Sequence, residues 1–404
     1  MGLAGYLAML FLFTTPIRSE STAPPVFEGP RALKHVIALT DIGKRPGASA
    51  NARKAADYLK AQFESYGYQV AEQRFPMISF EDKETKLSIL GPNALEIPAS
   101  PVIYSPSGHL TAEVVAVPLP GIASNFKRAD LKGKIALVRR GEISNTEKIA
   151  CAAKAGALAI LLYNNSPQEC LSFNWGGPAA IPALWLSGTD GEKLLTSLNT
   201  GPVMVRLDSE TVHAQREGIN IVATRPGKSN KTLVFGAHYD SVTNNSLGAN
   251  DNASGVAVVL ELARVLAQAD RPETLVFIGF DGEEEGTLGS QAYVQQLTSK
   301  QRNAVQIMFN FDEVGAGDIP FSFGGNKTLA KKAVKAAGQR GIKVNAEFSE
   351  GGSSDHAPFV NAGIDTLWIF QDFPFFHSAL DSPEKINPDG LAASGNIALD
   401  LLKE

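Results

Sequence analysis

Residues 232–281 decide the fold: they hold the apolar run TLVFGA (Thr232–Ala237), the segment SGVAVVLELARVLA (Ser254–Ala267) and the apolar run TLVFIGFD (Thr274–Asp281). The two short runs are rich in β-branched and aromatic residues, which is typical of buried strands. The segment between them has the length and apolar spacing of a helix. A strand, a helix and a second strand in this order predict one unit of a parallel sheet.

The same alternation continues on both sides of this unit. Further strands are predicted at INIVA (Ile219–Ala223), VQIMFNFD (Val305–Asp312) and TLWIF (Thr366–Phe370), and helices at Ser49–Tyr66, Leu329–Gly338 and Asp389–Leu402. The expected fold class is therefore α/β, with a mostly parallel mixed sheet between two layers of helices. In such sheets, ligands bind at the carboxyl ends of the strands.

Composition limits the classes of protein that need to be considered. The chain has 404 residues, which suggests two or three domains, and its formal net charge of -5 argues against a nucleic-acid-binding protein. Its 2 cysteines can make neither a disulfide scaffold nor a four-thiolate zinc site. Any metal ion must therefore be held mainly by carboxylates and by some of the 6 histidines.

The pattern changes between about residues 114 and 207. Strands are predicted at KIALV (Lys134–Val138), ALAILLY (Ala157–Tyr163) and IPALWL (Ile181–Leu186), with helices at Glu147–Ala155 and Gly191–Leu198. This module resembles a small domain inserted into a larger one. Both cysteines, Cys151 and Cys170, fall in it. They either form a disulfide bond or are two small buried side chains.

The N-terminus carries one apolar run, Leu3–Phe13, which is followed by a polar segment and by Pro24-Pro25. The run is too short for a bilayer span, which needs about 20 residues, but it has the length of a signal-peptide core. We expect residues 1–22 to be a signal peptide, a secreted or periplasmic location, and no membrane span in the mature chain. The alternative is a buried apolar N-terminal segment.

Metal-type ligands follow successive predicted strands. Imidazole and carboxylate groups occur just after four strands and in the loop that follows one of them: His238, Asp251, Glu283, Glu284, Asp312 and His377. One polar residue at a strand end is ordinary, since such positions are solvated and a lone Asp is often a helix cap. Ligand types at five such positions predict a shared site for a divalent cation.

Several motifs in a fixed order resemble those of the M28 zinc peptidases. They are LTDIGKRPGASANARKAADYLKAQF (Leu39–Phe63), HYDS (His238–Ser241), GANDNASG (Gly248–Gly255), DGEEEGTLGS (Asp281–Ser290), NFDEVG (Asn310–Gly315), SSDHAPF (Ser353–Phe359) and FHSALDSPEKI (Phe376–Ile386). The middle module resembles a protease-associated (PA) domain through DLKGKIALVRRG (Asp130–Gly141), KIACAAKAGALAILLYN (Lys148–Asn164) and IPALWLS (Ile181–Ser187). The resemblance implies a discontinuous catalytic domain over residues 30–110 and 208–404, and a PA insert over residues 111–207.

The resemblance also implies a role for each matching residue. Asp251 corresponds to a carboxylate that bridges two zinc ions. His238 and Asp312 complete one site, and Glu284 and His377 complete the other. Glu283 corresponds to the general base, because the positions of Gly286, Gly289 and Ser290 select Glu283 and Glu284 as the family's Glu pair. Glu285 is then expected to face solvent.

Further positions carry weaker expectations. Asp240, two residues after His238, is expected to accept the free ring N–H of a ligating imidazole. Asp355 and His356 lie in an element that the family has near the substrate cleft, and for His356 a structural hydrogen bond is an equal alternative. Several relatives have Tyr where this chain has Phe376, which has no donor. The family also has a cis peptide bond at the position of Asp251–Asn252.

The resemblance implies a secreted aminopeptidase with two zinc ions per chain, whose substrates are peptides with a free N-terminus. A metal-activated water would attack the peptide carbonyl, with Glu283 as the base. The alternatives are an M28-like carboxypeptidase or glutaminyl cyclase and, from another class, an inactive receptor on the same scaffold. The presence of all five ligands and the base disfavours the receptor. The sequence leaves the preferred N-terminal residue and the oligomeric state open.

Overall fold

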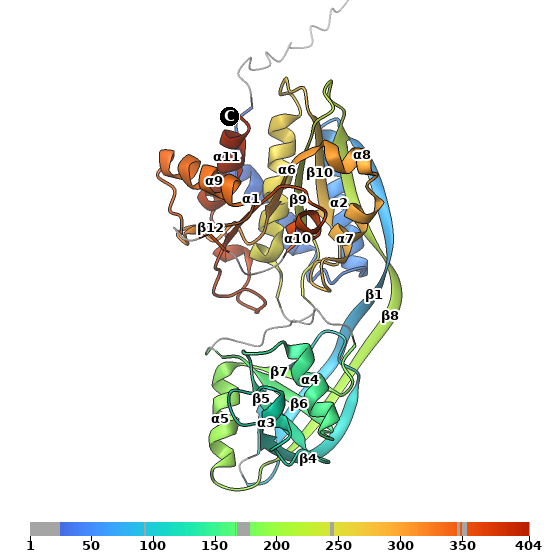
Figure 1. Ribbon diagram of the computed structural model, residues 1–404, viewed down its shortest axis with the longest axis vertical. Helices are drawn as coiled ribbons and strands as arrows, with labels where there is room; N and C mark the ends of the chain where they lie inside the picture. Colours follow the sequence, from blue (N-terminus) through green and yellow to red (C-terminus); the bar gives the residue numbers. More distant parts are fainter. Residues whose placement is uncertain are drawn as a thin grey trace, which may run out of the picture.

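The computed structural model describes residues 25–92, 94–165, 167, 178–242, 246–345, 348–349 and 354–403. Two α/β bodies are joined by two long strands that run through both (Figure 1). The large body contains α1, α2 and the elements from β9 to the C-terminus, and the small body contains β3–β7 and α3–α5. The predicted signal peptide and the possible Cys151–Cys170 bond lie outside the described residues.

The large body is built on a sheet whose four central strands are parallel. Strand order is β12-β13-β11-β9-β10-β8, with the outer strands β12 and β8 antiparallel to their neighbours. The strands are β8 (Met204–Arg225), β9 (Thr232–His238), β10 (Thr274–Phe280), β11 (Val305–Phe311), β12 (Phe321–Gly325) and β13 (Thr366–Gln371). The predicted fold class is confirmed, although β12 was not predicted.

Helices cover both faces of this sheet. They are α1 (Gly29–Asp41), α2 (Ala50–Ser65), α6 (Gly255–Leu266), α7 (Leu288–Gln296), α8 (Ser299–Ala304), α9 (Lys327–Gln339), α10 (His356–Asn361) and α11 (Pro388–Leu401), with a short 3₁₀ turn at Pro383–Lys385. Side chains alternate between two cores, as the period of a strand requires. On one face Phe235, Phe277 and Phe309 stack at 4.8 and 5.0 Å between ring centres. On the other face Val234 and Ile278 pack near α7 and α10.

The two bodies are connected by a two-stranded antiparallel ribbon. Strands β1 (Gln69–Ile89) and β8 (Met204–Arg225) pair from Gln69↔Thr224 to Ile89↔Val205, with one register shift between Asp82 and Glu84. The sequence predicted only Ile219–Ala223 of β8, because the rest of the strand has few buried residues. Its strand conformation depends on pairing with a segment about 135 residues away.

The small body has its own parallel sheet. Strands β4, β5, β6 and β7 are parallel neighbours, and β3 lies antiparallel to β7. The elements are β2 (Leu95–Ile97), β3 (Ser100–Pro101), β4 (Gly108–Ala116), α3 (Ala123–Phe126), β5 (Ile135–Arg139), α4 (Asn145–Lys154), β6 (Ala159–Tyr163), β7 (Ala183–Leu186) and α5 (Gly188–Leu198). Its core also includes Leu87 and Ile97, which precede residue 111. The boundary at residue 111 stays a prediction.

Among the described helices, none combines the length and the apolar composition that crossing a bilayer would require. The longest described helix is α2, with 16 residues, and its N-cap Ser49 accepts a hydrogen bond from the amide of Ala52, as the sequence predicted.

Candidate metal centre

The predicted ligands converge at the carboxyl edge of the large body's sheet. His238 is the last residue of β9, and Asp312 directly follows β11. Glu283 and Glu284 follow β10, and His377 lies six residues beyond the end of β13. Since these four strands are parallel neighbours, their carboxyl ends meet at one edge.

Asp251 lies at the centre of this cluster, in the irregular turn Ala249–Ser254 between β9 and α6. Its Oδ1 is 3.4 Å from Nε2 of His238, and its Oδ2 is 3.0 Å from Nε2 of His377. The Nε2 atoms of the two histidines also face Asp312 Oδ1 at 3.4 Å and Glu284 Oε2 at 3.0 Å, respectively. The bond between Asp251 and Asn252 is cis, as expected.

The cluster is buried and strongly acidic. Burial raises the pKa of Glu283 well above its usual value and that of Glu284 to about 7. Burial alone lowers the pKa of His377, but Glu284 and Asp251 outweigh it and raise the pKa to about 10. Within the described residues, no lysine or arginine forms an ion pair with the clustered carboxylates. The negative charge is therefore left to be balanced by bound cations.

Two groups of donors could each hold a cation. His238, Asp251 and Glu284 have ligand atoms within 4.8 Å of one another, and so do His238, Glu283 and Asp312. Glu284 Oε1 is buried without a hydrogen-bond partner, which leaves it available to a cation. Nitrogen and oxygen donors of this kind suit zinc, so the residues fit the metal that the sequence predicted.

Neighbouring side chains fix the orientation of the donors. Asp240, fully buried, has Oδ1 3.5 Å from Nδ1 of His238 and accepts the backbone N–H of Glu284 on Oδ2 at 3.1 Å. The Ser354 hydroxyl donates to Oδ2 of Asp312 at 2.7 Å. Asp240 was predicted from its spacing to His238, whereas Ser354 was not, although it lies inside the quoted motif SSDHAPF.

Asp381 was also missed. Its two carboxylate oxygens accept the backbone N–H groups of Asn250 at 2.7 Å and Asp251 at 3.1 Å, so it supports the turn that carries the central carboxylate. Burial raises the pKa of Asp381 to about 7. It is four residues beyond His377 in the quoted motif, and this proximity is the one signal in the sequence that could have found it.

Arg45 is the third residue that was missed. Its fully buried guanidinium donates to the backbone carbonyls of Tyr239 (2.8 Å), Leu247 (2.9 Å) and Gly248 (2.9 Å). These carbonyls belong to the segments that follow His238 and precede Asp251. Burial lowers the pKa of Arg45 to about 10, although nearby Asp381 opposes this shift. A single Arg thus ties the chain before α2 to both ligand-bearing segments.

The three remaining predicted residues occupy different surroundings. Asp355 is fully buried, and burial raises its pKa to about 7. His356 stacks on Trp368 with ring centres 4.7 Å apart, and burial lowers its pKa to about 4. The Phe376 ring lies 4.2 Å from the ring of His377. Phe376 therefore supports a ligand by packing and offers no hydrogen-bond donor.

The expectation that Glu285 faces solvent is wrong. Its side chain is only 5% exposed, and its Oε1 accepts the backbone N–H of Gly47 at 3.2 Å. The loop after β10 packs against the segment before α2, and this long-range contact buries the third glutamate of the run. No local pattern in the sequence signals such a contact.

The imidazoles and carboxylates at the edge of the parallel sheet form a candidate cation site, and relatives identify the protein as a metallo-exopeptidase. The chain belongs to peptidase family M28, whose model matches residues 220–402, and a PA domain model matches residues 110–194. Aminopeptidase YwaD of Bacillus subtilis is 32% identical over 396 residues, which cover 94% of this chain and 85% of that protein.

Solved structures agree with this assignment. A zinc aminopeptidase from Bacillus subtilis is similar with a TM-score of 0.77 and 30% identity, covering 93% of this chain and 94% of that one. An aminopeptidase from Aneurinibacillus sp. strain AM-1 has a TM-score of 0.76 and 30% identity, covering 92% and 93%. A glutaminyl cyclase from Porphyromonas gingivalis, at 18% identity and a TM-score of 0.53, covering 93% and 98%, shares the fold alone.

Proposed function

We propose that the protein is a di-zinc aminopeptidase that releases the N-terminal residue of peptides with a free N-terminus. One observation carries the proposal: the two oxygens of Asp251 face two different histidines. Two dications about 3.5–4 Å apart repel one another and need a shared anion between them. A carboxylate with one oxygen on each side is suited to that task.

The division of the other donors follows from the same geometry. His238 and Asp312 would complete the site on one side of Asp251, and His377 and Glu284 the site on the other side. Asp240 would hold the ring of His238 through Nδ1, and such a partner fixes both the tautomer and the ring orientation. Asp381 and Arg45 would hold the turn that presents Asp251.

Glu283 would act as the general base. Zinc bound at these residues would lower the pKa of water towards about 7 and polarise the peptide carbonyl. Glu283 would take a proton from the attacking water and return it to the leaving amine, so no net proton is consumed by the residue. Because its carboxylate lies beside the ligands in a buried site, the proton transfers would be short and shielded from bulk water.

The remaining expectations follow from the sequence. We propose that residues 1–22 direct export and that residues 111–207 form the PA insert within a catalytic domain of residues 30–110 and 208–404. The enzyme would act on peptides outside the cytoplasm. We expect Asp355 and His356 to lie near the substrate rather than among the metal ligands.

Hydrolysis of aminoacyl p-nitroanilides tests the proposal. We expect wild type to cleave them, a chelator to abolish cleavage, and Glu283→Ala to lower kcat by about 10²–10⁴-fold with an unchanged zinc content. Glu81→Ala, which removes an exposed glutamate on β1, is the matched control and should behave as wild type.

Three outcomes would contradict parts of the proposal. Hydrolysis that survives both the chelator and Glu283→Ala would refute the mechanism. Equal cleavage of N-acetylated substrates would refute the aminopeptidase assignment. A zinc content of one ion per chain in fully active enzyme would refute the di-zinc centre and favour a cyclase-like arrangement.

A further inference from the structure

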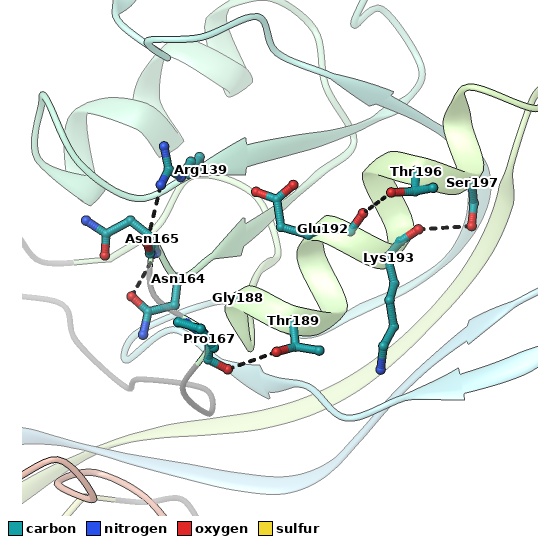
Figure 2. A pocket seen from close by; sticks show the side chains of 10 residues that line it. All are labelled: Arg139, Asn164, Asn165, Pro167, Gly188, Thr189, Glu192, Lys193, Thr196 and Ser197. Carbon is teal, nitrogen blue, oxygen red and sulfur yellow. Dashed lines mark hydrogen bonds between the residues drawn. The ribbon is translucent and has the colours of Figure 1, made fainter.

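A groove of about 720 Å³ lies in the small body, away from the predicted ligands. One wall is the helix α5, and the other comprises Arg139, Asn164 and Asn165 (Figure 2). Arg139 is the last residue of β5, Asn164 directly follows β6, and α5 begins two residues after β7. The groove therefore occupies the carboxyl edge of the small body's parallel strands, the position where α/β sheets bind ligands.

The strand-end wall presents hydrogen-bond donors without partners. Asn164 is 2% exposed, and its Oδ1 accepts from the backbone N–H of Asn165 at 2.9 Å and from Arg140 at 3.4 Å. Its Nδ2 has no hydrogen-bond partner among the described residues. Nε of Arg139 is likewise buried and unpartnered, while Nη2 donates to the carbonyl of Asn165 at 3.3 Å. Buried donors are rarely left unsatisfied, since each costs about 1–3 kcal/mol. Neither atom has an acceptor among the described residues, so an acceptor bound in the groove would satisfy both.

The start of α5 adds donors of the same kind. Gly188 and Thr189, its first two residues, line the groove, and the first amides of a helix have no carbonyl partner within the helix. The helix dipole also favours an anion at this end. Asp190 lies in this first turn, where its carboxylate accepts from the Ser187 hydroxyl at 2.7 Å and pairs with Lys193 at 3.1 Å.

An acceptor lies on the opposite wall. The carboxylate of Glu192, one turn into α5, lines the groove (Figure 2), and among the described residues it forms no ion pair with Arg139. The Glu192 carboxylate also accepts a hydrogen bond from the Tyr163 hydroxyl, which leaves further lone pairs on its oxygens. Donors at one end and an acceptor at the other match the end of a peptide. Its carboxylate accepts hydrogen bonds, and its last amide N–H donates one.

We propose that this groove is a second peptide-binding site, which takes the free C-terminal carboxylate of a peptide through Arg139, Asn164 and the first amides of α5. Guanidinium and carboxylate groups make strong, charge-assisted hydrogen bonds. Glu192 accepts the last amide N–H of the bound peptide. The site is independent of the metal centre and of the reaction proposed for it.

Calorimetry with acetyl-Ala-Ala-Leu tests this site, because its blocked amine excludes it as an aminopeptidase substrate. The zinc-loaded full chain is first saturated with leucine hydroxamate, so that the metal centre is covered. We expect the free acid to bind and its C-terminal carboxamide to bind at least about tenfold more weakly, since a hydrogen bond to a charged group contributes about 1.5–3 kcal/mol.

Arg139→Gln should weaken binding of the free acid by about tenfold or more on the same basis. Arg128→Gln, which removes an exposed arginine of the same body, should leave binding unchanged. Both variants should hydrolyse aminoacyl p-nitroanilides as wild type does, which separates this test from the test of the proposed function. Should Arg139→Gln not fold, Arg139→Lys keeps the charge, loses the planar fork and should still weaken binding.

Equal binding of acid and carboxamide would overturn the proposal. So would wild-type affinity in a folded Arg139 variant, or loss of peptide binding when the hydroxamate is added, because the peptide would then occupy the metal centre.

Discussion

The two bodies of this molecule have the same architecture, but the residues at their strand ends suit ligands of opposite charge. In each, parallel strands end at a common edge, and the residues that follow the strands line a site there. In the large body these residues are histidines and carboxylates, which suit cations. In the small body they are Arg139, Asn164 and the first amides of α5, which suit an anion. Sheet topology thus determines where a site forms, and the residues after each strand determine what it binds.

The difference extends to how each site is supported. The backbone N–H of Asp251 donates to the buried carboxylate of Asp381, and Arg45 reaches the same turn from a distant part of the chain. The groove in the small body is more open. One of its walls is the helix α5, and the other consists of a few residues at strand ends. A centre that must place reacting groups needs a rigid outer layer of partners, whereas a site that only binds needs fewer of them.

Removing the central carboxylate should have the largest effect and should be confined to the large body. Asp251→Ala deletes the anion that we propose lies between two metal ions, and metal ions contribute several kcal/mol to such reactions. We expect kcat/KM to fall by about a thousandfold or more, with zinc content reduced. Binding of acetyl-Ala-Ala-Leu to the groove should be unchanged in calorimetry. Near-normal turnover in this variant would show that Asp251 is not the bridge.

A cavity created by substitution in the core of the small body should test whether the two bodies unfold separately. Trp185, on β7, is fully buried in the core of the small body that packs against α3 and α4. Trp185→Ala should cost about 3–5 kcal/mol of stability. In a thermal scan, we expect its first unfolding transition to leave hydrolysis of aminoacyl p-nitroanilides intact.

Phe277→Ala is the matched variant in the core of the large body. Its first transition should remove hydrolysis. If Trp185→Ala also loses hydrolysis at its first transition, the two bodies unfold as one unit.

Acid should destabilise the large body before the small one. His35, on α1, is buried against Tyr58, and burial lowers its pKa from 6.5 to about 4. The neutral ring is favoured in the folded state, so its stabilisation is present above pH 6.5 and is lost as pH falls towards 4. The full contribution is about 3 kcal/mol. No histidine occurs in residues 111–207.

Denaturant unfolding at pH 7, 5.5 and 4 measures this contribution. His35→Gln should flatten the pH dependence of the large body's unfolding free energy, and the exposed-histidine variant His109→Gln should not. An unchanged pH dependence in His35→Gln would mean that other groups, such as the buried His356, account for it.

The smallest effect is expected from Asp381→Asn. An amide offers one acceptor oxygen where the carboxylate offers two, so one of the hydrogen bonds from Asn250 and Asp251 is lost. Loss of such an outer partner lowers metal affinity by about 10–100-fold, or about 1.4–2.7 kcal/mol. Competition with a chromogenic chelator measures this. Asp389→Asn, an exposed carboxylate on α11, should bind zinc as wild type does.

The sequence predicted the clustered donors because their position follows from local patterns. Buried strands are recognised in the sequence as apolar runs, and the carboxyl ends of parallel strands meet at one edge. His238 and Asp312 could therefore be predicted to lie close together. Strands β5, β6 and β7 and helices α4 and α5 of the small body were predicted for the same reason, whereas β2, β3, β4 and α3 were not. Helix α1 was missed, although its apolar residues Ala32, Val36 and Leu39 are helically spaced.

The rest depends on contacts between distant segments. Arg45 is an ordinary loop residue in the sequence, and only its contacts with the carbonyls of Tyr239, Leu247 and Gly248 make it a buried anchor. Glu285 was expected to face solvent because its contact with Gly47 crosses 238 residues of chain. Only part of strand β8 was predicted, because half of it is stabilised by pairing with β1 rather than by packing in a core.

Because β1 and β8 pair as a ribbon, the chain enters and leaves the small body at two neighbouring points. Met77 and Arg216 are cross-strand partners there, so their backbones are separated by about one strand spacing, near 4.8 Å. We therefore expect that the small body can be removed or replaced at this pair. A two-residue turn that joins the strands beyond this pair would close a hairpin, and another module could be grafted at the same seam without a flexible linker.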